Sequence, residues 1–190
     1  PFVWMLTTSL KTSREASAPE IDLIPQTMHW ENYANALTTA PFGVYFYNTF
    51  IVAFTVMSCV VITSLLAGYA FARLEFRGRN LLFAFLLATM MVPFEVTLIP
   101  NFLLVRDLGW YNTYAALIVP WCASAFSIFL VRQSFLALPN DFFEAARVDG
   151  CGHLRFLAWI AAPLVKPSLV TIALFSFLGS YNSLIWPIVV

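Results

Sequence analysis

Residues 50–72 read FIVAFTVMSCVVITSLLAGYAFA and contain no charged side chain. As an α-helix this stretch is about 35 Å long, which is enough to cross a hydrocarbon core of ~30 Å. The uncharged region extends back to residue 32. Because the apolar run is continuous rather than alternating, it predicts a membrane-spanning helix and argues against the strands of a closed barrel.

The rest of the chain has the composition of a membrane protein. Of its 190 residues, 61% are hydrophobic and 11% are charged, whereas a soluble domain has about 45–50% apolar and about 25% charged residues. A domain of this size could not keep so much apolar surface from water. Soluble enzymes, disordered regulators and secreted disulfide scaffolds are therefore excluded. Ten basic residues balance ten acidic ones, so no net charge indicates a nucleic-acid partner.

Further apolar runs predict additional spans. The second run covers residues 81–105 and is interrupted only by Glu95. The third run covers residues 108–131, and residues 167–190 form the beginning of a fourth span. The opening residues 1–10 look like the tail of an earlier span. We therefore predict an all-α, polytopic helical membrane protein, and we expect the chain to be a fragment because it starts without methionine and stops inside an apolar run.

The distribution of Lys and Arg predicts the orientation of these spans. If the spans alternate, two short loops on one side carry seven basic residues, against three on the other side, which marks the first side as cytoplasmic. Residues 12–44 then form an extracytoplasmic segment and residues 132–168 a cytoplasmic loop, both within one membrane domain, 1–190. The seven basic residues are Arg73, Arg77, Arg79, Arg132, Arg147, Arg155 and Lys166.

The cytoplasmic loop predicts a short helix. Residues 138–167 read LPNDFFEAARVDGCGHLRFLAWIAAPLVKP. Asp141 followed by Glu144 fits an N-terminal capping pattern, and Gly150 suits the left-handed residue that ends a helix. We therefore expect a helix over residues 142–149.

A second helix is expected from His153 to Pro163, where the missing backbone donor would break it. The short helix would then project as a compact knob, with Ala145 and Ala146 forming a flat patch that a partner can approach closely. An amphipathic helix lying on the membrane surface is the alternative. The apolar anchors of the knob would be Phe142, Phe143 and Val148.

This loop resembles the EAA loop of importer-type ABC permeases. The family signature is EAA, three residues, Gly, nine residues, Ile, any residue, Leu and Pro. Ala162 stands where the family usually has Leu, a modest loss of apolar bulk. At the other positions the match is complete, with Glu144, Ala145, Ala146, Gly150, Ile160 and Pro163 at the required intervals.

Residues 64–80, 90–120, 128–150 and 177–189 are also similar to the permeases of carbohydrate importers, specifically the maltose-type second membrane subunit. The resemblance implies a type I ABC importer transmembrane domain with six spans, of which about five are visible here. It further implies a multi-pass protein of the prokaryotic plasma membrane that forms a sugar path with a second permease. An extracytoplasmic solute-binding protein would deliver the sugar, and a cytoplasmic ABC ATPase dimer would supply the energy.

ATP and Mg would bind to that ATPase, so the chain itself is expected to bind no cofactor; it has no GxxxxGK[ST] phosphate loop. In the family, the EAA loop docks in a cleft of one ATPase. Glu144 would help to fix the loop there, although simple helix capping is an equal and compatible role. By resemblance, the coupling residues are Glu144, Ala145, Ala146, Asp149, Gly150, Ile160 and Pro163.

Polar groups inside the spans are candidates for the sugar path. An ionised acid in a span costs about 2.5–3.5 kcal/mol, so Glu95 indicates either a path-lining group or an acid that fixes a proline-broken backbone. Tyr181, Asn182 and Trp186 combine aromatic faces with an amide, as sugar binding requires. The same residue types also occur at membrane interfaces and between packed helices.

Other functions are less consistent with the sequence. An importer of glycerol phosphate, a polyamine or a peptide is the closest alternative. A phosphate would require basic groups in the cavity, and none of the four long apolar runs contains Lys or Arg. A membrane-embedded enzyme needs convergent titratable groups at one depth, and only Glu95 is available. An assembly scaffold would not require the EAA spacing. We therefore expect a transport subunit, not an enzyme.

Overall fold

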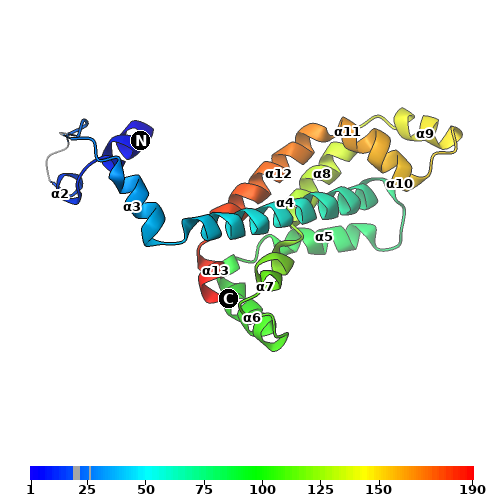
Figure 1. Cartoon of the computed structure of the whole chain (residues 1–190). Coiled ribbons are helices and arrows are strands. Elements are labelled where there is room, and N and C mark those ends of the chain that lie inside the picture. The colour runs from blue at the N-terminus through cyan, green and yellow to red at the C-terminus, as the bar shows by residue number, and fades with distance from the viewer. Residues whose placement is uncertain (19–21, 26) are drawn as a thin grey trace. The chain divides into compact units, whose positions relative to one another are not determined.

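The computed structural model describes residues 1–18, 22–25 and 27–190, and every regular element in these ranges is a helix (Figure 1). This confirms the prediction of an all-α protein. Contacts between Cα atoms divide the chain into two compact units, Pro1–Asn48 and Thr49–Val190. Each unit is described by itself.

The first unit contains α1 (Phe2–Ser9), α2 (Ser13–Ala16) and α3 (Glu31–Thr39). A capping box begins α2, since the Thr12 side chain accepts from the Glu15 backbone N–H at 3.2 Å and the Glu15 carboxylate accepts from the Thr12 backbone N–H at 3.1 Å. The predicted extracytoplasmic segment falls in this unit, with residues 19–21 and 26 outside the described residues, and its side of the membrane stays a prediction.

The first predicted span is α4 (Phe42–Arg73), a helix of 32 residues that starts earlier than the predicted 50–72. One face of α4 is buried in the second unit, and its members recur every three or four residues, as an α-helix requires. Most of them are small, which allows neighbouring helices to approach closely. The buried residues are Ala53, Val56, Val60, Ser64, Gly68, Tyr69 and Ala72.

The second predicted span is not one helix. Its two parts, α5 (Arg79–Thr89) and α6 (Phe94–Asp107), meet at 99°. Pro93 is the extended residue just before α6, and it disfavours helical geometry for the residue before it. The span predicted over 81–105 is therefore divided into two helices, and the pair forms either a broken span or a re-entrant loop.

The third predicted span is also interrupted. It consists of α7 (Tyr114–Ile118), the 3₁₀ turn η1 (Val119–Trp121) and α8 (Ala125–Leu136), with a bend of 41° before α8. Ser124 caps α8, because its hydroxyl accepts from the Ser127 backbone N–H at 3.3 Å. The bend therefore has a local cause in the sequence.

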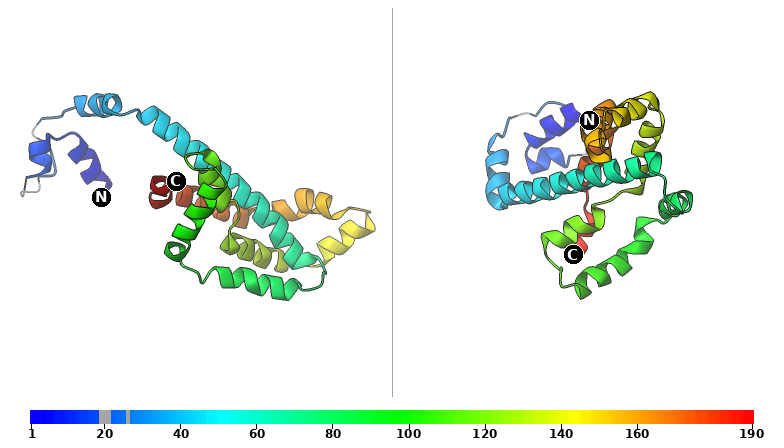
Figure 2. Two further views of the ribbon diagram at one scale, coloured as in Figure 1. Left: turned by 90° about the horizontal axis from the view of Figure 1, so that it is seen from below. Right: turned by 90° about the vertical axis from the view of Figure 1, so that its right-hand side faces the viewer.

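The fourth predicted span is confirmed near its expected position. It consists of α12 (Lys166–Tyr181) and α13 (Ile185–Val189), a stretch of 24 residues that is long and apolar enough to cross a membrane. The described part of the chain contains two such helices, or up to four if each bent pair is one span. In the second unit α8 packs against both α5 and α12 (Figure 2).

We predict that Gly68→Ala destabilises the protein. A Cβ atom at Gly68 would lie 2.8 Å from Val131 Cγ1 and 3.1 Å from the Arg132 backbone nitrogen, which cannot move without distorting α8. Overpacking of this kind costs about 1–3 kcal/mol. The melting temperature in detergent, followed by size-exclusion chromatography after heating, should fall.

Gly179→Ala in α12 is the matched control, since nothing lies within 4 Å of its added Cβ. Its stability should stay unchanged or rise slightly through helix propensity. Equal melting temperatures for Gly68→Ala and the wild type would contradict the close packing of α4 on α8.

Candidate functional site

The short helix predicted in the loop is α9 (Asp141–Val148), shifted by one residue from the expected range (Figure 1). It ends as predicted, because Gly150 has a φ of +73°. The Cys151 backbone N–H donates to the Ala146 carbonyl at 2.8 Å, and the Gly150 N–H donates to the Arg147 carbonyl at 3.0 Å. These two bonds form a Schellman motif, which satisfies the last carbonyls of the helix.

The start of α9 differs from the prediction. The N-cap residue is Asn140, and no side chain caps the helix, so the predicted capping by Asp141 and Glu144 is wrong. The backbone N–H groups of Phe143 and Glu144 donate instead to the Asn140 carbonyl at 2.8 and 3.0 Å. The Asn140 side-chain oxygen accepts from the Arg73 guanidinium. Glu144 is therefore an exposed carboxylate on α9 rather than a cap.

The two faces of α9 have different surroundings. Ala146 is buried, and the ring of Phe143 packs on that of Phe156 with centroids 5.3 Å apart. The other face is exposed, with Val148 at 88% of its maximal accessibility. Two of the residues expected to meet a partner, Phe143 and Ala146, therefore seat the helix on the protein's own core. The outward residues of α9 are Asp141, Phe142, Glu144, Ala145, Arg147 and Val148.

A groove of ≈ 410 Å³ lies beside the C-terminal end of α9. Its lining includes the charged side chains of Asp149 and Arg155 and the exposed side chain of Trp159. The groove thus combines charged and apolar groups, as suits a protein surface that accepts side chains from a partner. The lining residues are Ala146, Asp149, Cys151, Arg155, Trp159 and Ile160.

The helix after Gly150 starts at His153 as predicted and ends at Leu164, one residue beyond the predicted end at Pro163. It runs through α10 (His153–Phe156), the π-helical turn η2 (Leu157–Ala161) and α11 (Ala162–Leu164). Pro163 does not break it, because it occupies the first turn of α11, where a backbone donor is not required. Ile160 is half-buried against the core and Pro163 is exposed.

Glu95 lies beside the break between α5 and α6, which divides the predicted second span. It lies in the first turn of α6, directly after the break from α5, and is exposed. An acid in that position is favoured by the helix dipole. Within the described ranges, the Glu95 carboxylate accepts no hydrogen bond. The structure therefore gives no support to the prediction that Glu95 fixes the broken backbone. Its role in a solute path stays a prediction.

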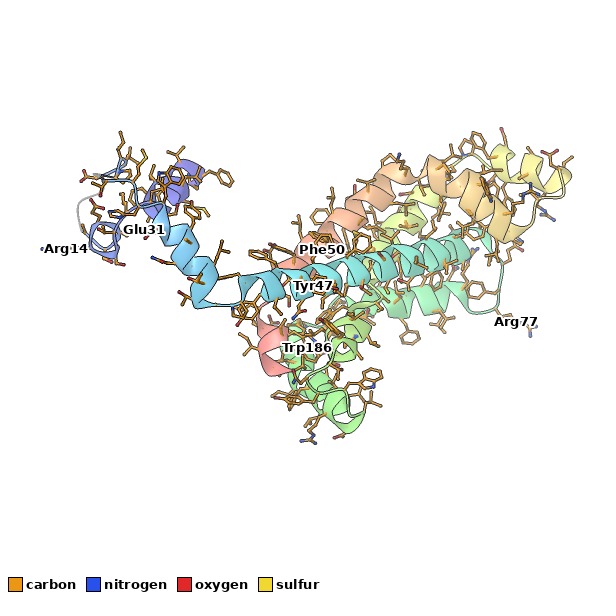
Figure 3. The ribbon with its side chains drawn as sticks, in the orientation of Figure 1. Arg14, Glu31, Tyr47, Phe50, Arg77 and Trp186 are labelled. Carbon is orange, nitrogen blue, oxygen red and sulfur yellow. The ribbon has the colours of Figure 1, made fainter. Side chains whose placement is uncertain are left out.

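The other three path candidates do not share one surface. Trp186, on α13 (Figure 3), is only 2% exposed, and its indole N–H donates to the Ala116 carbonyl at 2.9 Å. The Asn182 amide donates to the Leu178 carbonyl at 2.9 Å, at the end of α12. Tyr181 is partly exposed and stacks on Phe177. Sugar contacts by these residues stay a prediction, and the geometry gives Trp186 a packing role.

Sequence reasoning missed two residues at the end of α4. It used Arg73 only to orient the chain, whereas its guanidinium donates to the carbonyls of Phe135 (2.8 Å) and Leu138 (2.7 Å) and to Asn140. The Tyr69 hydroxyl lies 2.9 Å from His153 Nδ1. The spacing of four residues could have placed Tyr69 and Arg73 on one helix face. These contacts also bring the loop after α4 close to the predicted cytoplasmic loop 132–168. The alternation of spans predicted that these two Arg-rich loops lie on the same side.

Comparison with known families shows which family has this architecture. Residues 60–190 match the model of the binding-protein-dependent transport system inner membrane component. The chain belongs to this family. The membership confirms the predicted resemblance to ABC importer permeases and makes the chain a membrane component of a transport system.

The proteins that are similar to this chain are named after several different solutes. The chain is 34% identical over 190 residues to the diacetylchitobiose uptake system permease protein NgcG of Streptomyces coelicolor, covering 99% of the chain and 63% of that protein. It is 33% identical to the sn-glycerol-3-phosphate transport system permease protein UgpE of Yersinia enterocolitica (100% and 69% covered). It is 34% identical to the arabinooligosaccharides transport system permease protein AraQ of Halalkalibacterium halodurans (100% and 69% covered).

A solved structure has the same fold. It is the crystal structure of a bacterial ABC transporter involved in the import of the acidic polysaccharide alginate, with a TM-score of 0.89 and 27% identity. The match covers 98% of the permease chain and 66% of that chain. The permease chain thus spans about two thirds of the length of the proteins it matches.

We predict that Trp186→Phe lowers the stability of the second unit. The substitution keeps an aromatic ring but removes the hydrogen bond to the Ala116 carbonyl and leaves that buried acceptor unsatisfied, which costs about 1–3 kcal/mol. The thermal midpoint in detergent should fall. Trp159→Phe is the control, because Trp159 is 78% exposed. If both variants melted with the wild type, the Trp186 hydrogen bond would contribute nothing measurable.

Proposed function

We propose that this chain is a membrane-spanning permease subunit of an ATP-driven sugar importer in the plasma membrane of a prokaryote. It would form the translocation path together with a second permease subunit, and an extracytoplasmic binding protein would deliver the sugar. One observation carries the proposal: α9, with EAA spacing, presents an exposed face at the end of the second unit where the Arg-rich loops meet.

The loop has the features that docking to an ATPase requires. Phe142 and Val148 offer apolar contact area and Glu144 offers a carboxylate, all from one short helix whose position is fixed by the Schellman motif and by the buried Ala146. A partner helix or loop could enter the adjoining groove. In this proposal the ATPase dimer holds ATP and Mg, and the permease contributes a mechanical link and a path.

The mechanism we infer is alternating access. Closure of the ATPase pair around ATP would displace the docked α9, and the helix bundle would rock around a site near the middle of the membrane. The bent pairs α5–α6 and α7–α8 are typical of transporter spans, in which irregular backbone faces protein or a water-filled cavity rather than lipid.

A sugar is the solute class that the chain supports best. Two of the relatives above carry saccharide names, and one carries the name of glycerol 3-phosphate. A phosphate ester would require a basic group in the path, and the four apolar runs contain neither Lys nor Arg. Glycerol phosphate remains the second candidate because of the relatives named UgpE.

Co-purification tests the proposal. The full-length protein, tagged and extracted in mild detergent, should carry with it a P-loop ATPase and a second multi-span protein, identified by mass spectrometry. Their ATP hydrolysis should rise with a neutral oligosaccharide and its binding protein, and not with glycerol 3-phosphate. Recovery of the chain alone, under conditions that keep a control importer intact, would favour a free-standing enzyme or scaffold.

We further predict that Gly150→Val uncouples transport from ATP hydrolysis while membrane insertion stays normal. Nothing lies within 4 Å of an added Cβ, so the cause is the backbone: φ is +73°, a conformation that costs an L-residue roughly 1–2 kcal/mol. Loss of the turn would misplace α9. Solute uptake and ATP hydrolysis are measured together in proteoliposomes.

Gly152→Val is the matched control. Gly152 lies two residues away with φ −71° and ψ 160°, an extended conformation that suits a β-branched residue, and its added Cβ would also meet no atom. It should transport as the wild type does. Normal uptake by well-expressed Gly150→Val would remove the turn from the coupling mechanism.

A further inference from the structure

We propose that Tyr69 and Arg73 are positioning residues that clamp the α9 loop to the end of α4, so that α9 and α4 move as one body. This inference rests on the proposed function only where it concerns coupling to an ATPase. The clamp itself is a property of the second unit.

Arg73 holds the segment that enters α9. It is the last residue of α4, and its guanidinium reaches three acceptors: the Phe135 carbonyl at 2.8 Å, the Leu138 carbonyl at 2.7 Å, and the Asn140 side chain. The Phe135 carbonyl belongs to the last turn of α8, where helical donors are missing, and the Leu138 carbonyl lies two residues beyond the helix. Asn140 is the N-cap residue of α9. One planar cation therefore joins three helices, and the fork of donors that this needs is specific to Arg.

Tyr69 holds the segment that leaves α9. Its hydroxyl lies 2.9 Å from Nδ1 of His153, the first residue of α10. The Tyr69 side chain is 4% exposed, and its ring packs on Phe135 and Phe156 with centroids 5.7 and 6.2 Å apart. Because Tyr69 lies one turn before Arg73, both ends of the α9 segment are held by one face of the same helix.

The inner face of α9 completes this attachment. Ala146 is buried in the same apolar cluster as Tyr69, Phe135 and Phe156, and Phe143 packs against it. A displacement of α9 relative to α4 would therefore break charge-assisted hydrogen bonds and expose packed rings together. It follows that a force applied to the outer face of α9 displaces α4 with it, rather than deforming the loop.

The test uses variants that keep size and charge. Arg73→Lys keeps the positive charge that orients the chain but loses the forked contacts, and Tyr69→Phe keeps the ring but loses the hydroxyl. Arg77→Lys is the matched control, since Arg77 is exposed in the next loop and its side chain points away from the ribbon (Figure 3).

The clamp is tested first by a distance measurement on the full-length chain in nanodiscs. With the three cysteines replaced, spin labels at the exposed residues Leu66 on α4 and Val148 on α9 report the separation of the two helices. The wild type and Arg77→Lys should give one narrow distribution, and Arg73→Lys and Tyr69→Phe should each broaden it. An unchanged distribution in both variants would overturn the clamp, whatever happens to transport.

Coupling is tested second, in the assembled importer in proteoliposomes. Solute transported per ATP hydrolysed should fall roughly fivefold for the loss of one such contact, and further in the double variant, while the amount of co-purified ATPase stays constant. A broadened distribution with a normal transport ratio would overturn the coupling role. If no ATPase accompanies the wild type, the proposed function fails, and the distance measurement still decides the clamp. If Arg73→Lys does not fold, Tyr69→Phe decides alone.

Discussion

The requirement that every backbone polar group in a membrane find a partner within the protein governs this structure. Straight helices such as α4 meet it alone, but the bent spans release groups that need other donors. At the bend before α8, the Cys122 carbonyl accepts the Thr63 hydroxyl of α4 at 2.9 Å, and Ser124 caps the next helix. In α7, the Ala116 carbonyl also accepts the Trp186 indole N–H. The irregular segment around α7 and the start of α8 is thus satisfied by side chains that lie near it.

The same requirement shapes the loop that carries the candidate coupling site. The start of α9 uses the Asn140 carbonyl, its end uses the Schellman motif around Gly150, and the end of α8 uses the Arg73 guanidinium. Because these groups satisfy the backbone without using the outer face of α9, that face stays available for contact with another protein. The helix is held in place although its outer face is exposed, because Phe143 and Ala146 on its inner face pack into the core.

Local patterns in the sequence predicted what depends on neighbours along the chain. The apolar run of α4, the short helix α9 and the left-handed Gly150 all follow from residues close to one another, and the EAA spacing led to the family. A proline-broken backbone near Glu95 was expected, but the 99° bend between α5 and α6 was not, because the apolar composition continues across it. The capping of α9 was mispredicted because the Asn140 side chain is bound by Arg73, 67 residues earlier. Trp186 was read as a candidate path residue because burial against α7 cannot be seen in its own segment.

These contacts give α4 a particular place in the second unit. Thr63 reaches the bend before α8, Gly68 allows the Val131 side chain to approach, and Tyr69 and Arg73 hold the α9 loop. All four lie within three turns of one helix, and the groups that they meet belong to α8 and to the segments before and after it. A change at the loop can therefore reach the bend through the rigid backbone of α4, without passing along α8. This explains why a buried face made largely of small residues suits α4: bulky side chains there would hold it away from the groups whose positions it links.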